Sequence, residues 1–241
     1  MMKTIRFIIN PVSGVGKQKG IEELIKTNLN HDIFDCEVSY TKAAKHATEL
    51  AKEATEKNMD FVIAVGGDGT VNEVAKGLIH TNTTMGIIPM GSGNGLALHL
   101  NIPVEPIKAI QLINTCHVRK IDTCTANGIP FLNVSGIGFD SHIAHKFANA
   151  GTRGISTYLR LIISEWWNYS NRKYTLSYNN ETLETEAIMI SFANGTQFGN
   201  NFLISPNSLD NDGLLDICIL KKFPPIKIPS FLRHNFRRKA G

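Results

Sequence analysis

The sequence has few cysteines, and none of them stands in a pattern that builds a structural site. Cys36, Cys116, Cys124 and Cys218 form no CxxC pair and have no histidine at metal-ligand spacing. This absence excludes a zinc ribbon and argues against a disulfide-stabilised secreted scaffold. We therefore expect free thiols and a reducing, cytoplasmic compartment.

Long hydrophobic runs and low-complexity segments are also missing. The apolar run at residues 7–9 stops at Asn10 and Pro11, too early for the apolar part of a signal peptide. No stretch approaches the roughly 18 apolar residues that a membrane-spanning helix needs. Because 42% of the 241 residues are hydrophobic and 19% are charged, we expect a globular fold with a substantial core.

Positively charged residues only slightly outnumber negatively charged ones. The net charge of +4 is typical of an ordinary solvated surface and favours anionic partners weakly. The most basic segment is the tail at residues 233–241, which carries Arg233, Arg237, Arg238 and Lys239. We expect this tail to be poorly ordered, and to attract nucleic acid through non-specific charge rather than by specific recognition.

The N-terminal half alternates apolar strands with glycine-rich loops and helices. Four runs of strand length, each followed by helical periodicity, lie at residues 5–9, 36–41, 61–65 and 85–89. Continuous hydrophobicity, as opposed to strict alternation, is typical of strands that are covered on both faces. This pattern predicts an α/β domain with a doubly wound parallel sheet over residues 1–120.

The C-terminal half has the pattern of a β-rich domain. Strand patterns lie at residues 119–125, 131–135, 174–178, 187–192 and 214–220. Only residues 157–169 interrupt them with a helical pattern. This predicts a mainly antiparallel β-sandwich domain over residues 121–232, followed by the basic tail.

One glycine-rich loop, at residues 66–70 (GGDGT), comes directly after a buried strand and before a helix predicted over residues 71–78. Glycines allow a sharp turn there, and successive N–H groups at such a turn form an anion-binding concavity. Asp68 would repel a bare phosphate, but it suits a Mg²⁺ ion held against phosphates or the proton of an attacking hydroxyl. An isolated GGDG is as often a plain turn; the flanking strand and helix favour the functional interpretation.

Two further loops follow predicted strands. Residues 10–17 supply Ser13 and Lys17, although Gln18 breaks the GxxxxGK[ST] nucleotide motif. Residues 91–94 (GSGN) supply small residues and a hydroxyl. A capped turn explains either loop alone. Because the carboxyl ends of parallel strands meet at one edge of a sheet, we expect the three loops to converge on a nucleotide.

In their order and spacing these loops resemble the diacylglycerol kinase catalytic family, which includes bacterial lipid kinases and eukaryotic sphingosine and ceramide kinases. The matching segments are NPxSG at 10–14, GGDGTVNEV at 66–74 and PxGSGN at 89–94. Further similarity lies at 120–122, 133–140, 153–158, 205–206 and 212–216, so the resemblance covers nearly the whole chain. NAD kinases and phosphofructokinases share GGDGT, but they do not explain the first and third loops.

The resemblance implies an ATP-dependent lipid kinase that uses Mg²⁺. It implies catalytic roles for Asp68 and Asp122 in a Mg²⁺-linked network, and contact between Asp140 and the polar head of the lipid. Asp210, Asp212 and the carbonyl of Leu214 resemble a structural Mg²⁺ loop, although an Asn-Asp-Gly turn explains that segment slightly better. The residues implied to contact ATP are Asn10, Pro11, Ser13, Gly14, Lys17, Thr41, Gly66, Gly67, Asp68, Gly69, Thr70, Asn72, Glu73, Gly91, Ser92 and Asn94.

Two departures from the family pattern matter. In many bacterial members the third loop reads GTxND and its aspartate joins the network, whereas Gly95 stands at that position here. Family members also continue for several dozen residues beyond a point like Lys222, so we expect the C-terminal domain to be shortened. The alternative function is therefore a catalytically impaired protein that binds nucleotide or lipid and acts as a regulator.

The partners follow from the same resemblance. The lipid would be reached at a membrane surface by a cytoplasmic, peripherally associated protein. The aromatic residues Trp166, Trp167 and Tyr169 fit core packing, or an interfacial patch that meets the membrane. The sequence leaves open whether the chain is a monomer or a homodimer, and whether the lipid is diacylglycerol, phosphatidylglycerol, a sphingoid base or a ceramide.

Overall fold

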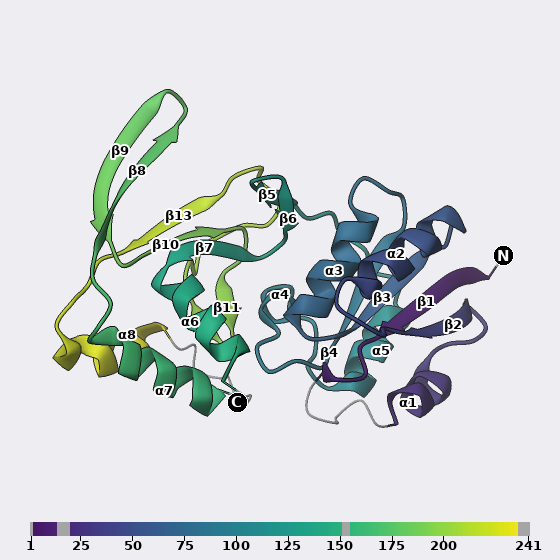
Figure 1. The fold of residues 1–241 in the computed structure, drawn as a ribbon. Helices are drawn as coiled ribbons and strands as arrows, with labels where there is room; N and C mark the ends of the chain where they lie inside the picture. The colour runs from purple at the N-terminus through teal and green to yellow at the C-terminus, as the bar shows by residue number, and fades with distance from the viewer. Residues whose placement is uncertain (1, 14–19, 151–154, 236–241) are drawn as a thin grey trace. The chain divides into compact units, whose positions relative to one another are not determined.

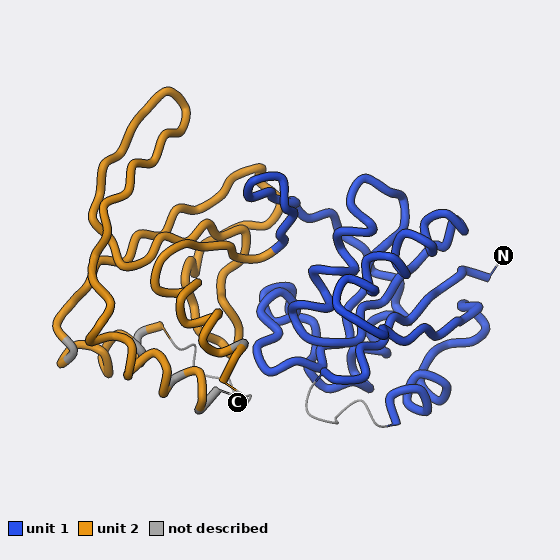
Figure 2. The backbone as a smooth tube through the Cα atoms, viewed as in Figure 1, with its two compact units in different colours: residues 1–132 blue, residues 133–241 orange. Residues whose placement is uncertain are grey.

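The structure, a computed structural model, divides into two compact units, residues 1–132 and 133–241 (Figure 2). It describes residues 2–13, 20–150 and 155–235. The first unit extends past residue 120, where the sequence placed the boundary. It includes a small hairpin made of β5 (Cys124–Ala126) and β6 (Ile129–Phe131).

The first unit is built on a four-stranded parallel sheet (Figure 1). Its strands lie in the order β2 (Phe34–Tyr40), β1 (Lys3–Ile9), β3 (Phe61–Gly66) and β4 (Thr84–Pro89). The chain adds β2 on one side of β1 and β3 on the other, so the strand order reverses between β1 and β3. Ligands bind at such a switch point in open α/β sheets. The predicted doubly wound parallel sheet is confirmed.

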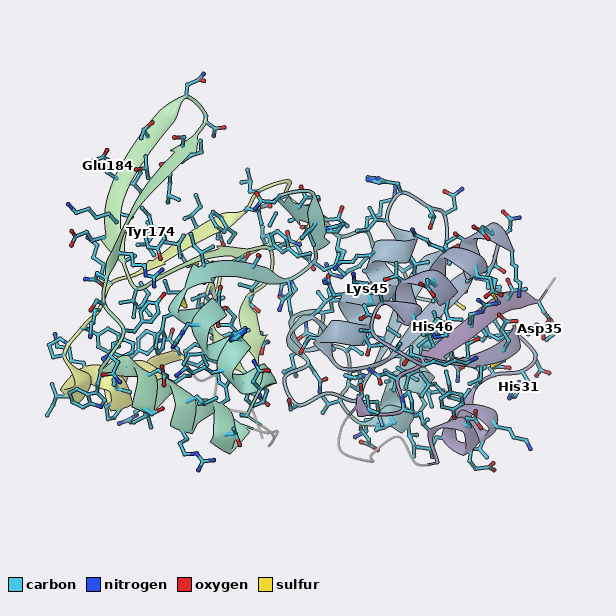
Figure 3. The ribbon with its side chains drawn as sticks, viewed as in Figure 1. His31, Asp35, Lys45, His46, Tyr174 and Glu184 are labelled. Atoms are coloured by element: carbon cyan, nitrogen blue, oxygen red, sulfur yellow. The ribbon has the colours of Figure 1, made fainter. Side chains whose placement is uncertain are left out.

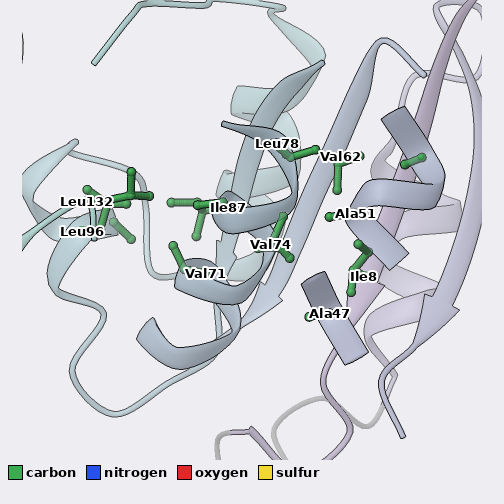
Figure 4. Packing of buried hydrophobic residues seen from close by; sticks show 14 of the residues in the cluster. Ile8, Ala47, Ala51, Val62, Val71, Val74, Leu78, Ile87, Leu96 and Leu132 are labelled. Atoms are coloured by element: carbon green, nitrogen blue, oxygen red, sulfur yellow. The ribbon is translucent and has the colours of Figure 1, made fainter. Parts of the chain in front are cut away.

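Helices cover both faces of this sheet. On one face, Ile8 and Val62 pack against α2 and α3 (Figure 4). On the other face, Phe7 and Ile63 pack against α1 and α5. Because neighbouring residues of a strand point to opposite faces, burial of both faces explains the continuous apolar runs. The helices of the first unit are α1 (Ile21–Asn28), α2 (His46–Glu56), α3 (Asp68–Leu78), α4 (Gly95–His99) and α5 (Pro106–Asn114).

One charged side chain lies inside this layered core. Arg6 of β1 is only 2% exposed. Its guanidinium donates hydrogen bonds to Glu37 of β2, to the carbonyl oxygen of Leu50 at 2.9 Å and to Glu53 of α2 at 3.1 Å. Arg6 therefore ties the edge strand and α2 to the centre of the sheet, and its charge is balanced by two half-exposed carboxylates.

We expect Arg6→Ala to lower the free energy of unfolding by about 3 kcal/mol, because a large buried side chain and its hydrogen bonds are lost together. Arg6→Met fills most of the space without the charge and should recover part of this loss. Urea denaturation of the wild type and both variants measures the difference.

The response to acid gives an independent check on Arg6. Hydrogen bonds from Lys57 and Arg6 hold the pKa of Glu53 below its ordinary value. The stabilisation that follows is present at neutral pH and is lost as the pH falls through this lowered pKa. The Arg6 variants should therefore lose less stability than the wild type below about pH 4. An identical loss in all three proteins would show that the ion pair contributes nothing.

The second unit is mainly antiparallel, as predicted. Its largest sheet has the order β13 (Asp216–Leu220), β10 (Met189–Ala193) and β7 (Val134–Gly138). A hairpin formed by β8 (Arg172–Tyr178) and β9 (Glu181–Ala187), which carries Tyr174 and Glu184, extends away from this sheet (Figures 1 and 3). A smaller hairpin joins β11 (Gln197–Gly199) to β12 (Phe202–Leu203).

The prediction of a single helical pattern in this half is wrong. The described part of the second unit contains α6 (Phe139–Ala148), α7 (Ile155–Trp166), the short 3₁₀ helix η2 (Pro225–Lys227) and α8 (Ile228–Asn235). α6 begins where Gly138, with a φ of 96°, turns the chain out of β7. α8 includes residues 233–235, so the predicted tail begins as a helix; residues 236–241 lie outside the described part.

The core of the second unit packs α6 and α7 against the segment that enters β10. Trp166 is 4% exposed and lies edge-on to Phe139, with ring centroids 5.6 Å apart. Ile143, Ile188 and Met189 complete the buried cluster. Core packing is therefore the role of Trp166. Among the described residues, none of the helices combines the length and the apolarity needed to cross a membrane.

Candidate functional site

The carboxyl ends of the four parallel strands form one edge of the sheet, and the three glycine-rich loops start there. The N–H of Asn10 donates to the carbonyl oxygen of Val65 at 3.0 Å, and that of Met90 donates to Gly66 at 2.8 Å. Thr41 lies beside the end of β1 and donates its N–H to Ile9 at 2.9 Å. The structure therefore brings together the start of the first loop, Thr41, and the second and third loops.

A side-chain hydrogen bond joins the first loop to the second. Nδ2 of Asn10 donates to Oγ1 of Thr70 at 3.0 Å, and Thr70 is 5% exposed. Oδ1 of Asn10 accepts the N–H of Val12 at 3.1 Å and turns the loop. A Cβ atom at Gly66 would lie 2.5 Å from Oγ1 of Thr70, so glycine is needed there. Asn10 and Thr70 thus shape the loops; their contact with ATP stays a prediction.

The second and third loops touch through two glycines. A Cβ atom on Gly91 would lie 2.5 Å from Cα of Gly67, and one on Gly67 would lie 3.1 Å from Cα of Gly91. Asn94 closes the third loop onto itself. Its Oδ1 accepts the N–H of Gly91 and its Nδ2 donates to the carbonyl oxygen of Gly91, both at 2.9 Å. The Asn94 side chain therefore holds the shape of the loop, a role that the motif alone did not indicate.

Asp68, the first residue of α3, links the second loop to the third. The residue as a whole is exposed, but protein atoms crowd its carboxylate, and this burial raises the pKa of Asp68. The N–H groups of Gly95, Leu96 and Asn94 donate hydrogen bonds to the carboxylate and oppose the shift. Gly95 stands where many family members have an aspartate, and it offers Asp68 a backbone donor. The residue types do not predict this contact, because every residue except proline has a backbone N–H group.

The remaining first-unit candidates lie around this junction. Gly69 has open space where a Cβ atom would stand, and Ser92 is exposed. Asn72 lies one helical turn after Asp68 on the same face of α3, and the carbonyl of Glu73 accepts a hydrogen bond from Thr48 of α2 at 2.8 Å. Pro11 and Ser13 lie at the start of the first loop, whereas Gly14 and Lys17 lie outside the described residues.

Asp122 lies just before β5 and is partly buried. Burial is the main reason why the pKa of the nearby Cys124 thiol is raised, and the charge of Asp122 raises it further. The Mg²⁺-linked network between Asp122 and Asp68 stays a prediction.

In the second unit, Asp140 lies in the first turn of α6 and pairs with Tyr158 of α7. The hydroxyl of Tyr158 donates to Oδ1 of Asp140 at 3.2 Å. Burial raises the pKa of Asp140 and outweighs the opposing effect of this hydrogen bond. Burial also raises the pKa of Tyr158, and the charge of Asp140 adds to that shift. The pair is an oriented acceptor in a partly apolar setting, which suits a hydroxyl or ammonium group.

The predicted structural Mg²⁺ loop has the geometry of a turn. Oδ1 of Asp212 accepts the N–H of Leu214 at 3.0 Å, and Gly213 has a φ of 73°. Asp210 is 4% exposed, whereas Leu214 is 67% exposed. Nowhere in the described ranges do three or more His, Cys, Asp or Glu side chains gather as a metal site would require. Coordination by Asp210, Asp212 and Leu214 stays a prediction.

Both units match known families. Residues 4–126 match the diacylglycerol kinase catalytic domain. The chain belongs to the diacylglycerol kinase catalytic-domain family. Residues 133–236 match the YegS C-terminal NAD kinase beta sandwich-like domain. The resemblance inferred from the three loops is confirmed, and the second match agrees with the antiparallel strands of the second unit.

Relatives support this membership along most of the chain. The diacylglycerol kinase of Bacillus subtilis is 30% identical over 241 residues, covering 92% of this chain and 75% of that protein. A protein named "Probable lipid kinase YegS-like" from Chromohalobacter salexigens is 31% identical over 184 residues, covering 74% of this chain and 59% of that protein. The chain spans about half to three quarters of the length of such curated relatives (48–75%).

A solved structure shares the fold. The crystal structure of a diacylglycerol kinase from Bacillus anthracis superposes with a TM-score of 0.74 at 28% identity, covering 98% of this chain and 78% of the other. The α/β unit followed by an antiparallel unit is therefore an arrangement that this family member shares.

Proposed function

We propose that this chain transfers the γ-phosphoryl group of ATP to a hydroxyl group of a lipid. The observation that carries the proposal is the junction of three loops at the switch point of the parallel sheet. Asn10 holds Thr70, Gly67 touches Gly91, and Asp68 accepts N–H groups of the third loop. The names of the relatives, diacylglycerol kinase and lipid kinase, support the same class of reaction.

The second loop would hold the phosphates. Its residues precede and begin α3, an 11-residue helix whose N-terminus carries partial positive charge and N–H groups with no carbonyl partner within the helix. The open space at Gly69 leaves room for a phosphate to approach the backbone. The exposed hydroxyl of Ser92 is a further donor at the same junction. Lys17, a predicted phosphate contact, would add a positive charge.

Asp68 fits a Mg²⁺–ATP complex better than free ATP. A carboxylate beside phosphates is repelled unless a cation lies between them. Mg²⁺ in nucleotide sites needs only one or two protein carboxylates, because phosphates and water complete its coordination. Asp68, with or without Asp122, meets that requirement without a cage of metal-ligating side chains. When bound, Mg²⁺ would neutralise charge on the phosphates.

The transfer itself places modest demands on the protein. The oxygen of the lipid hydroxyl forms a bond to the γ-phosphorus, and the bond from that phosphorus to the bridging oxygen of ADP breaks. The hydroxyl proton passes to a carboxylate, for which Asp68 is the candidate. Positioning and charge stabilisation supply most of the rate in such reactions, so loops held rigidly together are what the chemistry needs.

In the second unit, Asp140 is the proposed contact for the lipid head. One of its oxygens accepts the hydroxyl proton of Tyr158, which orients the carboxylate. A hydroxyl of diacylglycerol, or the hydroxyl or amino group of a sphingoid or ceramide-like lipid, could donate to it. The substrate class is therefore a lipid with a polar donor next to its acyl chains.

A regulatory protein that binds nucleotide without turnover is the second candidate function. The observation that favours it is the set of N–H groups that already surrounds the carboxylate of Asp68, with Gly95 in place of a further aspartate. Bonds from N–H groups favour the charged carboxylate and partly offset the burial that raises the pKa of Asp68, so they act against its uptake of a proton.

The deciding experiment is to incubate the full chain with labelled ATP, Mg²⁺ and a panel of lipids in mixed micelles. We expect label to appear in one lipid class, and to disappear when Mg²⁺ is chelated. The panel contains diacylglycerol, phosphatidylglycerol, a sphingoid base and a ceramide, and a reaction without lipid controls for ATP hydrolysis. Binding of ATP with no labelled lipid would favour the regulatory candidate, and failure to bind ATP would contradict both.

A further inference from the structure

We propose that two copies of this chain pair through β2, the edge strand of the parallel sheet, and so form one continuous sheet across a twofold axis. In the described part of the chain, β2 pairs with β1 on one side and with no strand on the other (Figure 1). An unpaired edge presents a row of backbone donors and acceptors that a further strand can use. Pairing of this kind does not depend on the proposed phosphoryl transfer.

The ladder between β1 and β2 shows which backbone groups of β2 point outward. Just after β2, the N–H of Thr41 donates to the carbonyl oxygen of Ile9 at 2.9 Å. The residues of a strand in a parallel pair alternate between bonding to the neighbour and pointing away from it. The odd-numbered residues of β2 therefore bond to β1. The N–H and C=O groups that point away from the sheet belong to Cys36, Val38 and Tyr40.

This edge lacks several features by which edge strands usually avoid pairing. β2 has the sequence FDCEVSY and contains no proline, glycine or lysine. All seven of its residues stay in register with β1, without a bulge. Two of the residues whose backbone groups point outward are also exposed, Val38 by 37% and Tyr40 by 43%. A second strand would therefore gain apolar contacts together with hydrogen bonds.

A twofold axis at Val38 gives the register that the side chains favour. It places Val38 opposite its own copy, Cys36 opposite Tyr40, and Glu37 opposite Ser39. No acidic residue of β2 then faces another acidic residue. An axis at Glu37 would place two carboxylates opposite each other, and an axis farther along β2 would pair fewer of its residues.

The same register fills a hollow beside the edge. The hollow lies between α1 and β2, has a volume of about 480 Å³, and its lining includes Ile25, Phe34 and Val38. Cys36 also lines it, and residues that lie opposite each other in antiparallel strands point to the same face of the sheet. Tyr40 of the second copy, opposite Cys36, would therefore cover the hollow and lose the exposure that it has in a single copy.

Charges on α1 complement each other across this axis. Glu22 accepts a hydrogen bond from the hydroxyl of Tyr40, and Lys26 lines the hollow together with Cys36. Both Glu22 and Lys26 are exposed. Because Tyr40 of one copy lies opposite Cys36 of the other, Glu22 of each copy comes next to Lys26 of the other. A second copy supplies this charge pattern by symmetry, whereas an unrelated extended peptide shares only the backbone bonds.

The test is analytical ultracentrifugation of the full chain over a range of concentrations, without ATP or lipid. We expect the wild type to show an equilibrium between monomer and dimer. Val38→Lys should weaken the dimer about tenfold, because two like charges meet at the axis. Val38→Pro should weaken it as much, since it removes an outward N–H group that the monomer does not need. Val118→Lys is the matched control, because Val118 is 52% exposed and lies outside α1 and β2, and it should dimerise as the wild type does.

A disulfide tests the register itself. Opposite residues that exchange hydrogen bonds in antiparallel strands have Cα atoms about 5.5 Å apart, which a disulfide can span. Under mild oxidation, Val38→Cys should therefore give a disulfide-linked dimer. Val118→Cys should not, and neither should the wild type, because Cys36 faces Tyr40 and not its own copy.

A charge swap tests the contact between the two α1 helices. Glu22→Lys places two lysines together and should weaken the dimer about fivefold, since each dimer contains two such pairs. The double variant Glu22→Lys, Lys26→Glu restores opposite charges across the axis and should recover the affinity of the wild type.

Any of three outcomes would overturn the proposal. They are a wild type that stays monomeric at every concentration, a dimer that Val38→Lys and Val38→Pro leave unchanged, and equal disulfide linkage in Val38→Cys and Val118→Cys. Thermal unfolding checks that each variant is folded. Val38→Lys should unfold as the wild type does, because the side chain it replaces is exposed, so the loss of its dimer can be assigned to the edge of the sheet.

Discussion

Asp68→Ala is expected to abolish phosphoryl transfer to lipid, with a loss of at least about a thousandfold in initial rate. The substitution removes the one carboxylate that begins α3 at the loop junction, and with it the proposed acceptor of the hydroxyl proton. It also leaves the N–H groups of Gly95 and Leu96 without their acceptor. Because Asp68 as a whole reaches solvent although its carboxylate is crowded, water can replace part of that acceptor, and the cost in stability should be about 1 kcal/mol. Initial rates with labelled ATP measure the first effect, and urea denaturation measures the second.

Two comparisons separate the possible roles of Asp68. Asp68→Asn keeps an oxygen that can accept N–H groups but removes the charge. If Asp68 only positions the third loop, the asparagine variant should keep much of the activity; if its charge is needed, it should be as inactive as the alanine variant. Asp35→Ala is the control, because Asp35 is an exposed acid near the start of β2, at the opposite edge of the sheet (Figure 3). Wild-type rates in Asp68→Ala would contradict the proposed function.

The parallel sheet was predictable because strands that are buried on both faces need continuous apolar runs, and such runs can be recognised in the sequence. β3 is buried at every position, so each of its residues must be apolar or glycine. The place of the loops follows from the same logic, since each parallel strand ends at the same edge of the sheet. The start of α3 was less predictable. The sequence indicated a helix from residue 71, whereas α3 begins at Asp68, inside the GGDGT segment. The GGDGT segment therefore forms the turn at Gly67 and also the first residues of the helix, Asp68 to Thr70.

Side-chain roles within the loops could not be predicted from residue types. Asn94 and Asp68 both looked like ligand contacts, but their visible partners are backbone groups of the protein itself. A backbone donor carries no signature in the sequence, so a motif cannot show which polar side chains are already occupied. The helix α6 was missed for a different reason. Its apolar residues Phe139, Ile143 and Phe147 recur every four residues, a signal masked by the strand-like segment before it.

The two adjacent tryptophans show a further limit of sequence reasoning. Trp166 lies in the core at 4% exposure and Trp167 lies in solvent at 65%. Trp166 is the last residue of α7 and Trp167 is the first residue after it. Neighbouring residues at helical spacing differ in direction by about 100°, so one of two identical residues can face the core while the other does not. Which of them faces the core depends on how α7 is rotated about its axis relative to β10 and α6. That rotation is set by the packing of the whole unit and not by the local sequence.

Gly91→Ala is expected to weaken ATP binding by about a hundredfold and to lower the free energy of unfolding by about 3 kcal/mol. The new Cβ atom would lie 2.5 Å from Cα of Gly67 and 2.9 Å from Oδ1 of Asn94. A side chain could rotate away from such a contact, but a backbone atom cannot. The second and third loops would therefore have to separate, and the donors that converge on the phosphates would separate with them. Equilibrium dialysis with ATP and urea denaturation measure the two effects.

Gly69→Ala provides the matched comparison, because it adds the same methyl group to the same loop system. Apart from its chain neighbours and the backbone of its own helix, no atom of the described residues lies within 4 Å of a Cβ atom at Gly69. Alanine in the first turn of α3 should therefore leave stability unchanged or raise it by about 0.5 kcal/mol. The added methyl group would instead occupy the space proposed for a phosphate. Gly69→Ala should therefore weaken ATP binding while the fold stays fully stable, whereas Gly91→Ala weakens both. If Gly69→Ala binds ATP like the wild type, the phosphates do not approach the backbone at Gly69. If Gly91→Ala is as stable as the wild type, the contact between the two loops is not what holds the site together.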